Sequence, residues 1–143
     1  MNYLDMHSIF LKKAFNLNIK TVGVLFADNN IDINIIKKIC KLDYDGLMID
    51  TVKKSSKSTL DIMGDNLINS FVSECHKIKK FCGLSGSMQQ NTIKYAMKFK
   101  SDFIGFRGAL CSPNSRDNIE STQCQNIIKI IKNINQKMYQ EAV

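Results

Sequence analysis

The sequence lacks the features that mark membrane and secreted proteins. Lysine and asparagine interrupt every hydrophobic block, so no apolar run is long enough to span a bilayer. The first residues, MNYLDMHSIFLKK, carry their lysines after the apolar patch, which is the wrong order for a secretory signal. Only one proline occurs in 143 residues, and no low-complexity tract or linker divides the chain. We therefore expect one globular domain, residues 1–143, in the cytoplasm and without membrane contact.

Histidine is also scarce, and the cysteines are not spaced as metal ligands. The chain has two histidines, His7 and His76, and no C-x-x-C pair. The five cysteines are Cys40, Cys75, Cys82, Cys111 and Cys124. Because four of the five have apolar neighbours, we interpret them as small buried hydrophobic residues in a reducing compartment. The sequence predicts no metal site and no cofactor.

The net charge of +7 favours an anionic partner. Most of the excess is lysine spread along the chain, with no basic block that carries interleaved aromatic residues. Recognition-helix and RNA-binding signatures are missing as well. Small phosphorylated ligands suit this charge. We do not expect a nucleic acid partner, and nucleic-acid binding remains only a third hypothesis.

Four short apolar runs predict strands of a parallel sheet, because such strands are apolar almost throughout rather than alternating. They cover residues 21–28, 45–50, 81–87 and 102–108. Residues 1–20 form a leading helix, and residues 21–143 form four βα units. Asp65 is the expected N-cap of the helix after the second strand. This order predicts an α/β fold with right-handed crossovers.

Two architectures fit four βα units. One is a small doubly wound domain with an open sheet. The other is half of an eightfold barrel, whose full length is typically about 250 residues. Both architectures place ligand sites at the carboxyl ends of the strands.

Two glycine-containing loops follow the third and fourth strands. Backbone N–H groups that glycine leaves accessible, followed by a helix N-terminus, form an anion site. In eightfold barrels, the loops after the seventh and eighth strands commonly hold a phosphate. The predicted phosphate site consists of Ser85, Gly86, Ser87, Arg107 and Gly108. The same glycines also suit tight strand-to-helix turns, which is the alternative.

Charged side chains at the strand ends complete the candidate site. Asp50 ends the second strand, and Lys54 follows closely enough to reach back over it. Such a pair suits proton transfer on a phosphorylated carbonyl compound, although a solvated connector is the alternative. Arg107 ends the fourth strand, where it either grips a phosphate or pairs with Asp50 or Asp28.

Three segments in this order resemble the (5-formylfuran-3-yl)methyl phosphate synthase family. They are IDTVKKSSKSTLD, CGLSGS and DFIGFRGALC. The resemblance implies that the chain is the second half of a TIM (βα)8 barrel, strands five to eight with their helices. It also implies that Asp50 and Lys54 are active-site residues, and that the 86–87 and 107–108 segments bind a substrate phosphate.

The family resemblance further implies a carbon–oxygen lyase of methanofuran-type cofactor biosynthesis. Such an enzyme joins two molecules of glyceraldehyde 3-phosphate through a lysine Schiff base and forms a furan aldehyde phosphate. The family's Schiff-base lysine lies in the first half of the barrel, and no residue here matches it. We therefore expect a partner, either a second copy of the chain or a separately encoded N-terminal half-barrel. The alternative is a non-catalytic, phosphate-binding half-barrel or a degenerate fragment.

Overall fold

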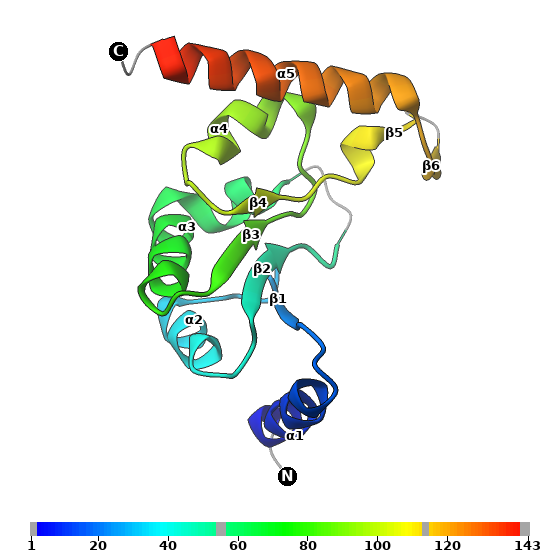
Figure 1. The fold of residues 1–143 in the computed structure, drawn as a ribbon. Coiled ribbons are helices and arrows are strands. Elements are labelled where there is room, and N and C mark those ends of the chain that lie inside the picture. Colours follow the sequence, from blue (N-terminus) through cyan, green and yellow to red (C-terminus); the bar gives the residue numbers. More distant parts are fainter. Residues whose placement is uncertain (1–2, 54–56, 113–114, 141–143) are drawn as a thin grey trace.

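The computed structural model describes residues 3–53, 57–112 and 115–140, and it is built on a four-stranded parallel sheet (Figure 1). The strands are β1 (Val22–Phe26), β2 (Gly46–Asp50), β3 (Phe81–Leu84) and β4 (Phe103–Ile104). The helices are α1 (Tyr3–Asn16), α2 (Ile33–Cys40), α3 (Thr59–Lys77), α4 (Ile93–Met97) and α5 (Ser121–Gln140). Short 3-10 turns are η1 (Gln90–Thr92) and η2 (Gly108–Leu110). The predicted α/β class is confirmed.

The sheet has the same strand order in space as in sequence, β1-β2-β3-β4, and all its pairs are parallel. Each predicted apolar run contains one of these strands. The fourth strand is shorter than predicted, because after Gly105 donates its N–H to Leu84 the chain turns into η2. A small antiparallel hairpin, β5 (Cys111–Ser112) and β6 (Ser115–Ile119), follows η2. The sequence analysis missed it because its strands are short and polar.

The hydrophobic core lies between the sheet and the helices α2 and α3. Strand residues such as Leu47 and Ile49 are fully buried there against Ile36 of α2 and Phe71 of α3. A second, smaller cluster joins α4, η2 and α5 through Ile93, Ala109 and Ile127. Among the residues that the structure describes, no helix is both long enough and apolar enough to cross a bilayer.

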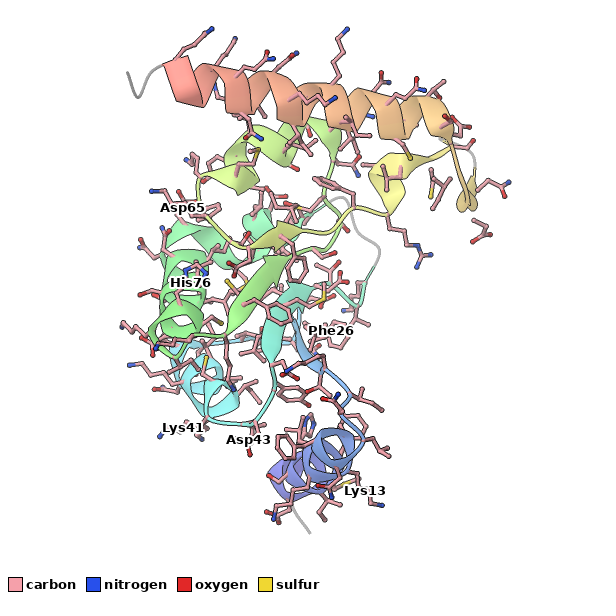
Figure 2. The ribbon with its side chains drawn as sticks, in the orientation of Figure 1. Lys13, Phe26, Lys41, Asp43, Asp65 and His76 are labelled. Carbon is pink, nitrogen blue, oxygen red and sulfur yellow. The ribbon has the colours of Figure 1, made fainter. Side chains whose placement is uncertain are left out.

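The opposite face of the sheet carries apolar side chains that remain exposed. We call Val22, Val24, Phe26, Phe81 and Phe103 the open face, and each of them is between 36% and 45% exposed. Figure 1 shows α2 and α3 on the other side of the sheet, and Figure 2 shows Phe26 pointing away from His76 of α3. The strands are therefore apolar on both faces, as predicted, but in the described chain only one face is buried.

Two rings of the open face lie over glycines of the neighbouring strands. Gly46 pairs with Phe81, and a β carbon on Gly46 would lie 2.3 Å from that ring. Gly83 pairs with Phe103, and a β carbon there would lie 2.1 Å from the ring. Only glycine leaves room for these rings, so each glycine is required by a close approach across the strands.

Helix α1 lies apart from the sheet, near the start of β1 (Figure 1). It buries Leu11 and Ala14 but leaves Ile9, Phe10 and Phe15 exposed. The segment after α1 is held by Asp45, which accepts hydrogen bonds from the Lys20 ammonium at 2.9 Å and from the Thr21 N–H at 2.7 Å. These contacts fix where β1 begins.

Candidate functional site

The carboxyl ends of β2, β3 and β4 surround a cavity of about 210 Å³. All the predicted site residues that the structure describes line this cavity. They are Asp50, Ser85, Gly86, Ser87, Arg107 and Gly108. Lys54 lies outside the described residues. The cavity is smaller than the roughly 300–1,000 Å³ of sites for drug-sized ligands, so its size suits one phosphate-bearing end of a small molecule.

The loop after β3 has a conformation that requires glycine. Gly86 has a φ of 95°, and a β carbon on it would lie 2.4 Å from Thr59 Oγ1 and 2.8 Å from the Thr51 nitrogen. Ser87 follows with a φ of 51°. These two left-handed residues turn the chain sharply at the mouth of the cavity.

Helix α3 locks this loop in place. The buried hydroxyl of Thr59 donates to the Ser85 carbonyl at 2.5 Å, and the Thr59 N–H donates to the Gly86 carbonyl at 3.1 Å. The sequence analysis did not single out Thr59, although it directly follows the polar KKSSKS connector.

The predicted N-cap of α3 at Asp65 is wrong. The cap is Ser58, which forms a capping box with Asp61. Hydrogen bonds from the Ser58 hydroxyl and N–H lower the pKa of Asp61. The chain leaves helical angles at Gly64, where φ is 68°, so the apolar stripe after Asp65 belongs to a second helical segment. The first segment serves the site, because its start holds the glycine loop.

Three consecutive N–H groups of the loop are available to a ligand. Within the described part of the chain, the N–H groups of Gly86, Ser87 and Met88 donate to no acceptor, and all three residues line the cavity. Adjacent backbone donors in a turn form a concave site for an anion. The loop therefore has the chemistry of a phosphate cradle.

Arg107 lies at the edge of the same cavity with an exposed side chain. Its carbonyl accepts from the Leu110 N–H at 3.0 Å and from the Cys111 thiol at 3.2 Å, which fixes its backbone. Among the described residues, no carboxylate forms an ion pair with the guanidinium. Neither the Asp50 nor the Asp28 pairing considered from the sequence is formed, so the guanidinium remains available to an anionic ligand.

Asp50 and Asp28 hold the segment after β2. Asp50 is half-buried at the end of the strand and accepts from the Thr51 N–H at 2.7 Å. Asp28 accepts from the N–H groups of Lys53 at 2.7 Å and Val52 at 3.0 Å, and these bonds lower its pKa. The turn after β1 therefore positions Val52 and Lys53, the residues that precede Lys54 in the sequence. From the sequence, Asp28 is expected only as a possible partner of Arg107.

Comparison of the sequence with models of protein families assigns the chain to a family. A family model described as 4-HFC-P synthase matches residues 4–128. The chain belongs to this family. The predicted resemblance to the (5-formylfuran-3-yl)methyl phosphate synthases of methanofuran biosynthesis is thereby confirmed.

The relatives named (5-formylfuran-3-yl)methyl phosphate synthase are longer than the part of them that this chain matches. The chain is 30% identical over 127 residues to the (5-formylfuran-3-yl)methyl phosphate synthase of Methanococcus maripaludis strain C6, which covers 84% of the chain and 54% of the relative. It is 32% identical over 85 residues to the synthase of Methanocaldococcus jannaschii, covering 59% of the chain and 36% of the relative. The chain thus spans about half the length of the C6 relative.

A similar solved structure supports the fold. Phosphoribosyl anthranilate isomerase from Thermus thermophilus, a protein of the TIM-barrel type, superposes with a TM-score of 0.62. The superposition covers 85% of this chain and 55% of the isomerase, at 5% sequence identity. At that identity the likeness concerns the fold alone.

Proposed function

We propose that this member of the synthase family provides the phosphate-binding half of an active site for a small phosphorylated aldehyde. The observation that supports this best is the convergence at the cavity. The segments that resemble the family lie far apart in sequence, yet those of their predicted site residues that the structure describes line one small space. The proposed reaction is that of a carbon–oxygen lyase, which joins two molecules of glyceraldehyde 3-phosphate and forms a furan aldehyde phosphate with loss of water and one phosphate.

In the proposed site, the N–H groups of Gly86 and Ser87 and the Arg107 guanidinium bind one substrate phosphate. Asp50, which lines the same cavity, transfers a proton on the bound carbon chain, and we assign Lys54 to the same step. A Schiff base withdraws electrons from the substrate carbon, so that a neighbouring base can remove a proton. The lysine that forms it belongs to the other half of the barrel.

We further propose that the chain is a half-barrel, and that the open face packs against four more βα units. The interior of a TIM barrel is filled by layers of side chains that point inward from the strands. The strand register places Phe26 of the open face beside Asp50. Units that cover this face would therefore bring their own side chains next to Asp50, where the Schiff-base lysine is needed.

Arginine substitution tests phosphate binding. Arg107→Ala should weaken binding of glyceraldehyde 3-phosphate by about 10-fold or more, because a hydrogen bond to a charged group contributes roughly 1.5–3 kcal/mol. Arg116 is the only other arginine in the sequence, and Arg116→Ala serves as the control. Calorimetric titration should show binding of glyceraldehyde 3-phosphate but not of glyceraldehyde. Equal affinity in both variants and the wild type would contradict the proposed phosphate site.

Light scattering after size exclusion tests the half-barrel. We expect the chain by itself to associate through the open face or to melt without cooperativity, because its sheet edges and apolar face are exposed. A stable homodimer would identify a second copy as the covering unit instead of a different half-barrel. A monomer that melts cooperatively would contradict any need for the other half.

A further inference from the structure

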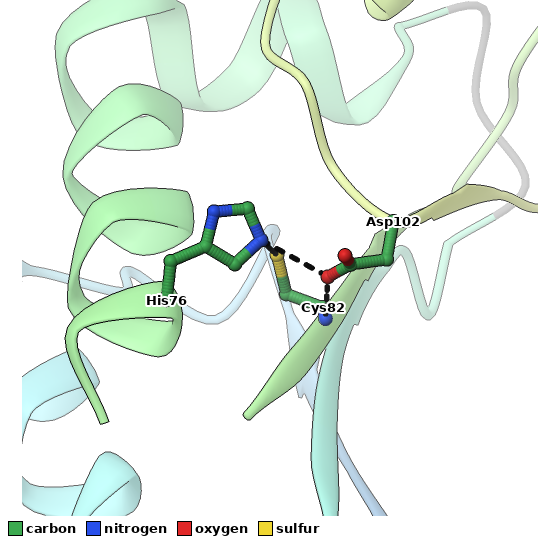
Figure 3. Close-up of side chains that lie close together, drawn as sticks. All are labelled: His76, Cys82 and Asp102. Atoms are coloured by element: carbon green, nitrogen blue, oxygen red, sulfur yellow. Dashed lines mark hydrogen bonds and ion pairs between the residues drawn. The ribbon is translucent and has the colours of Figure 1, made fainter. Parts of the chain in front are cut away.

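Three potential metal ligands meet at the amino-terminal end of the sheet, opposite the candidate site. His76 lies in the last turn of α3, Cys82 is the second residue of β3, and Asp102 directly precedes β4. Their ligand atoms all lie within 4.8 Å of one another (Figure 3). The sequence alone predicts no metal site, because histidine is scarce and these three residues are far apart along the chain.

The two distances from the ring nitrogen are close to those between ligands that share one ion. His76 Nε2 lies 3.0 Å from Asp102 Oδ2 and 3.6 Å from Cys82 Sγ. In a tetrahedral zinc site with bonds of about 2.0–2.3 Å, neighbouring ligand atoms lie about 3.2–3.6 Å apart. A small movement of the carboxylate is enough to admit the ion.

The carboxylate and the sulfur both approach the same ring nitrogen. A single N–H at Nε2 can point to only one of them, whereas a metal ion in its place can bond to all three groups. In a nucleophilic cysteine triad the acid and the thiol contact different nitrogens of the ring. Cys82 is moreover fully buried, so no substrate reaches its sulfur. The arrangement therefore fits coordination and does not fit nucleophilic catalysis.

The surrounding structure holds the ligands in place. The Cys82 N–H donates to Asp102 Oδ2 at 2.7 Å, and the Asp102 N–H donates to the Cys82 carbonyl at 2.9 Å. Such outer contacts orient metal ligands. The His76 and Asp102 side chains are 43% and 44% exposed, which leaves an entry path and room for a water ligand.

We propose that His76, Cys82 and Asp102 bind one zinc ion. Zinc accepts this mixture of nitrogen, sulfur and oxygen ligands, whereas calcium and magnesium prefer oxygen alone. The ion ties the end of α3 to the starts of two neighbouring strands. Its role is structural, because the candidate phosphate site lies at the other end of the strands. The proposal is therefore independent of the proposed reaction.

Zinc titration of the full 143-residue chain tests this proposal. We expect one zinc per chain after dialysis. Loss of a mere outer-shell partner costs about 10- to 100-fold in affinity, so His76→Gln should raise the dissociation constant by at least about 100-fold. His7→Gln, at the only other histidine, should bind zinc as the wild type does. His76 is exposed, so its substitution does not endanger folding.

Cobalt provides a second readout. Bound to the wild type, Co²⁺ should show a thiolate-to-metal charge-transfer band, which Cys82→Ser should remove and Cys124→Ser should retain. Zinc should raise the melting temperature of the wild type but not of His76→Gln. The proposal would be overturned if the wild type did not retain zinc, or if His76→Gln bound zinc as tightly as the wild type. It would also be overturned if the control variants His7→Gln and Cys124→Ser lost metal binding as His76→Gln and Cys82→Ser do.

Discussion

Replacing Gly86 with alanine tests how the candidate phosphate loop keeps its shape. The new β carbon would lie 2.4 Å from Thr59 Oγ1 and 2.8 Å from the Thr51 nitrogen, distances that real contacts do not reach. The φ of 95° adds backbone strain for any L side chain. Strain of this kind costs about 1–3 kcal/mol, and overpacking costs about 1–3 kcal/mol more. We expect Gly86→Ala to lower the free energy of unfolding by about 2–6 kcal/mol.

Two other glycines separate the contributions. Gly64 has a φ of 68° but no atom within 4 Å of its would-be β carbon, so Gly64→Ala should cost only the strain, about 1–2 kcal/mol after the gain in unfolded-state entropy. Gly108 has neither a positive φ nor a close neighbour, so Gly108→Ala should leave stability nearly unchanged. Urea unfolding of the three glycine variants measures these differences in the free energy of unfolding. In thermal unfolding, each kcal/mol should lower the melting temperature by about 2–4 °C.

Ligand binding gives the decisive comparison. Gly86→Ala should lose binding of glyceraldehyde 3-phosphate, because the displaced loop moves the N–H groups at the cavity. Gly64→Ala should retain it, since Gly64 does not line the cavity. Equal stability of the Gly86 and Gly108 variants, together with unchanged binding, would refute the assignment of this loop.

Three further predictions concern the segments around the cavity. The pKa of Asp28 in the folded protein lies below its ordinary value of 3.8. The charge on Asp28 therefore stabilises the fold above that ordinary pKa, and this contribution is lost as the pH falls through the folded pKa. In urea unfolding, the difference in stability between the wild type and Asp28→Asn should therefore shrink between about pH 6 and about pH 3. Thr59→Val removes the hydrogen bond to Ser85 and should cost about 1–3 kcal/mol in the same assay, while Thr59→Ser keeps the hydroxyl and should cost less. Val24→Lys should weaken association through the open face in light scattering but barely change the stability of the isolated chain, because Val24 is 45% exposed.

The strands and the candidate site were predictable for one physical reason. Parallel strands read as continuous apolar runs, and the polar residues that end them must fall at one edge of the sheet. Asp50, Ser85 and Arg107 are each at or just beyond such an end, so their meeting at one cavity followed from the strand assignment. Their chemical roles remain predictions, because proximity alone does not define a reaction.

Other contacts were not predictable from spacing. Asp28 reaches Lys53 across 25 positions, and His76 meets Asp102 across 26 positions. Both contacts depend on which strands are neighbours and on how each loop turns. The hairpin after η2 contains no run of apolar residues that would predict a strand. The start of α3 was placed too late because the capping box at Ser58 lies within a polar connector that reads as a loop.

The rings that lie over Gly46 and Gly83 have a consequence for how this sheet can evolve. Phe81 fills the space that a side chain at Gly46 would need, and Phe103 does the same for Gly83. A larger residue at either glycine becomes tolerable only after the facing phenylalanine has been replaced by a smaller one. Mutations in this layer therefore have a preferred order. Related sequences that carry a side chain at one of these glycines should already carry a small residue at its partner.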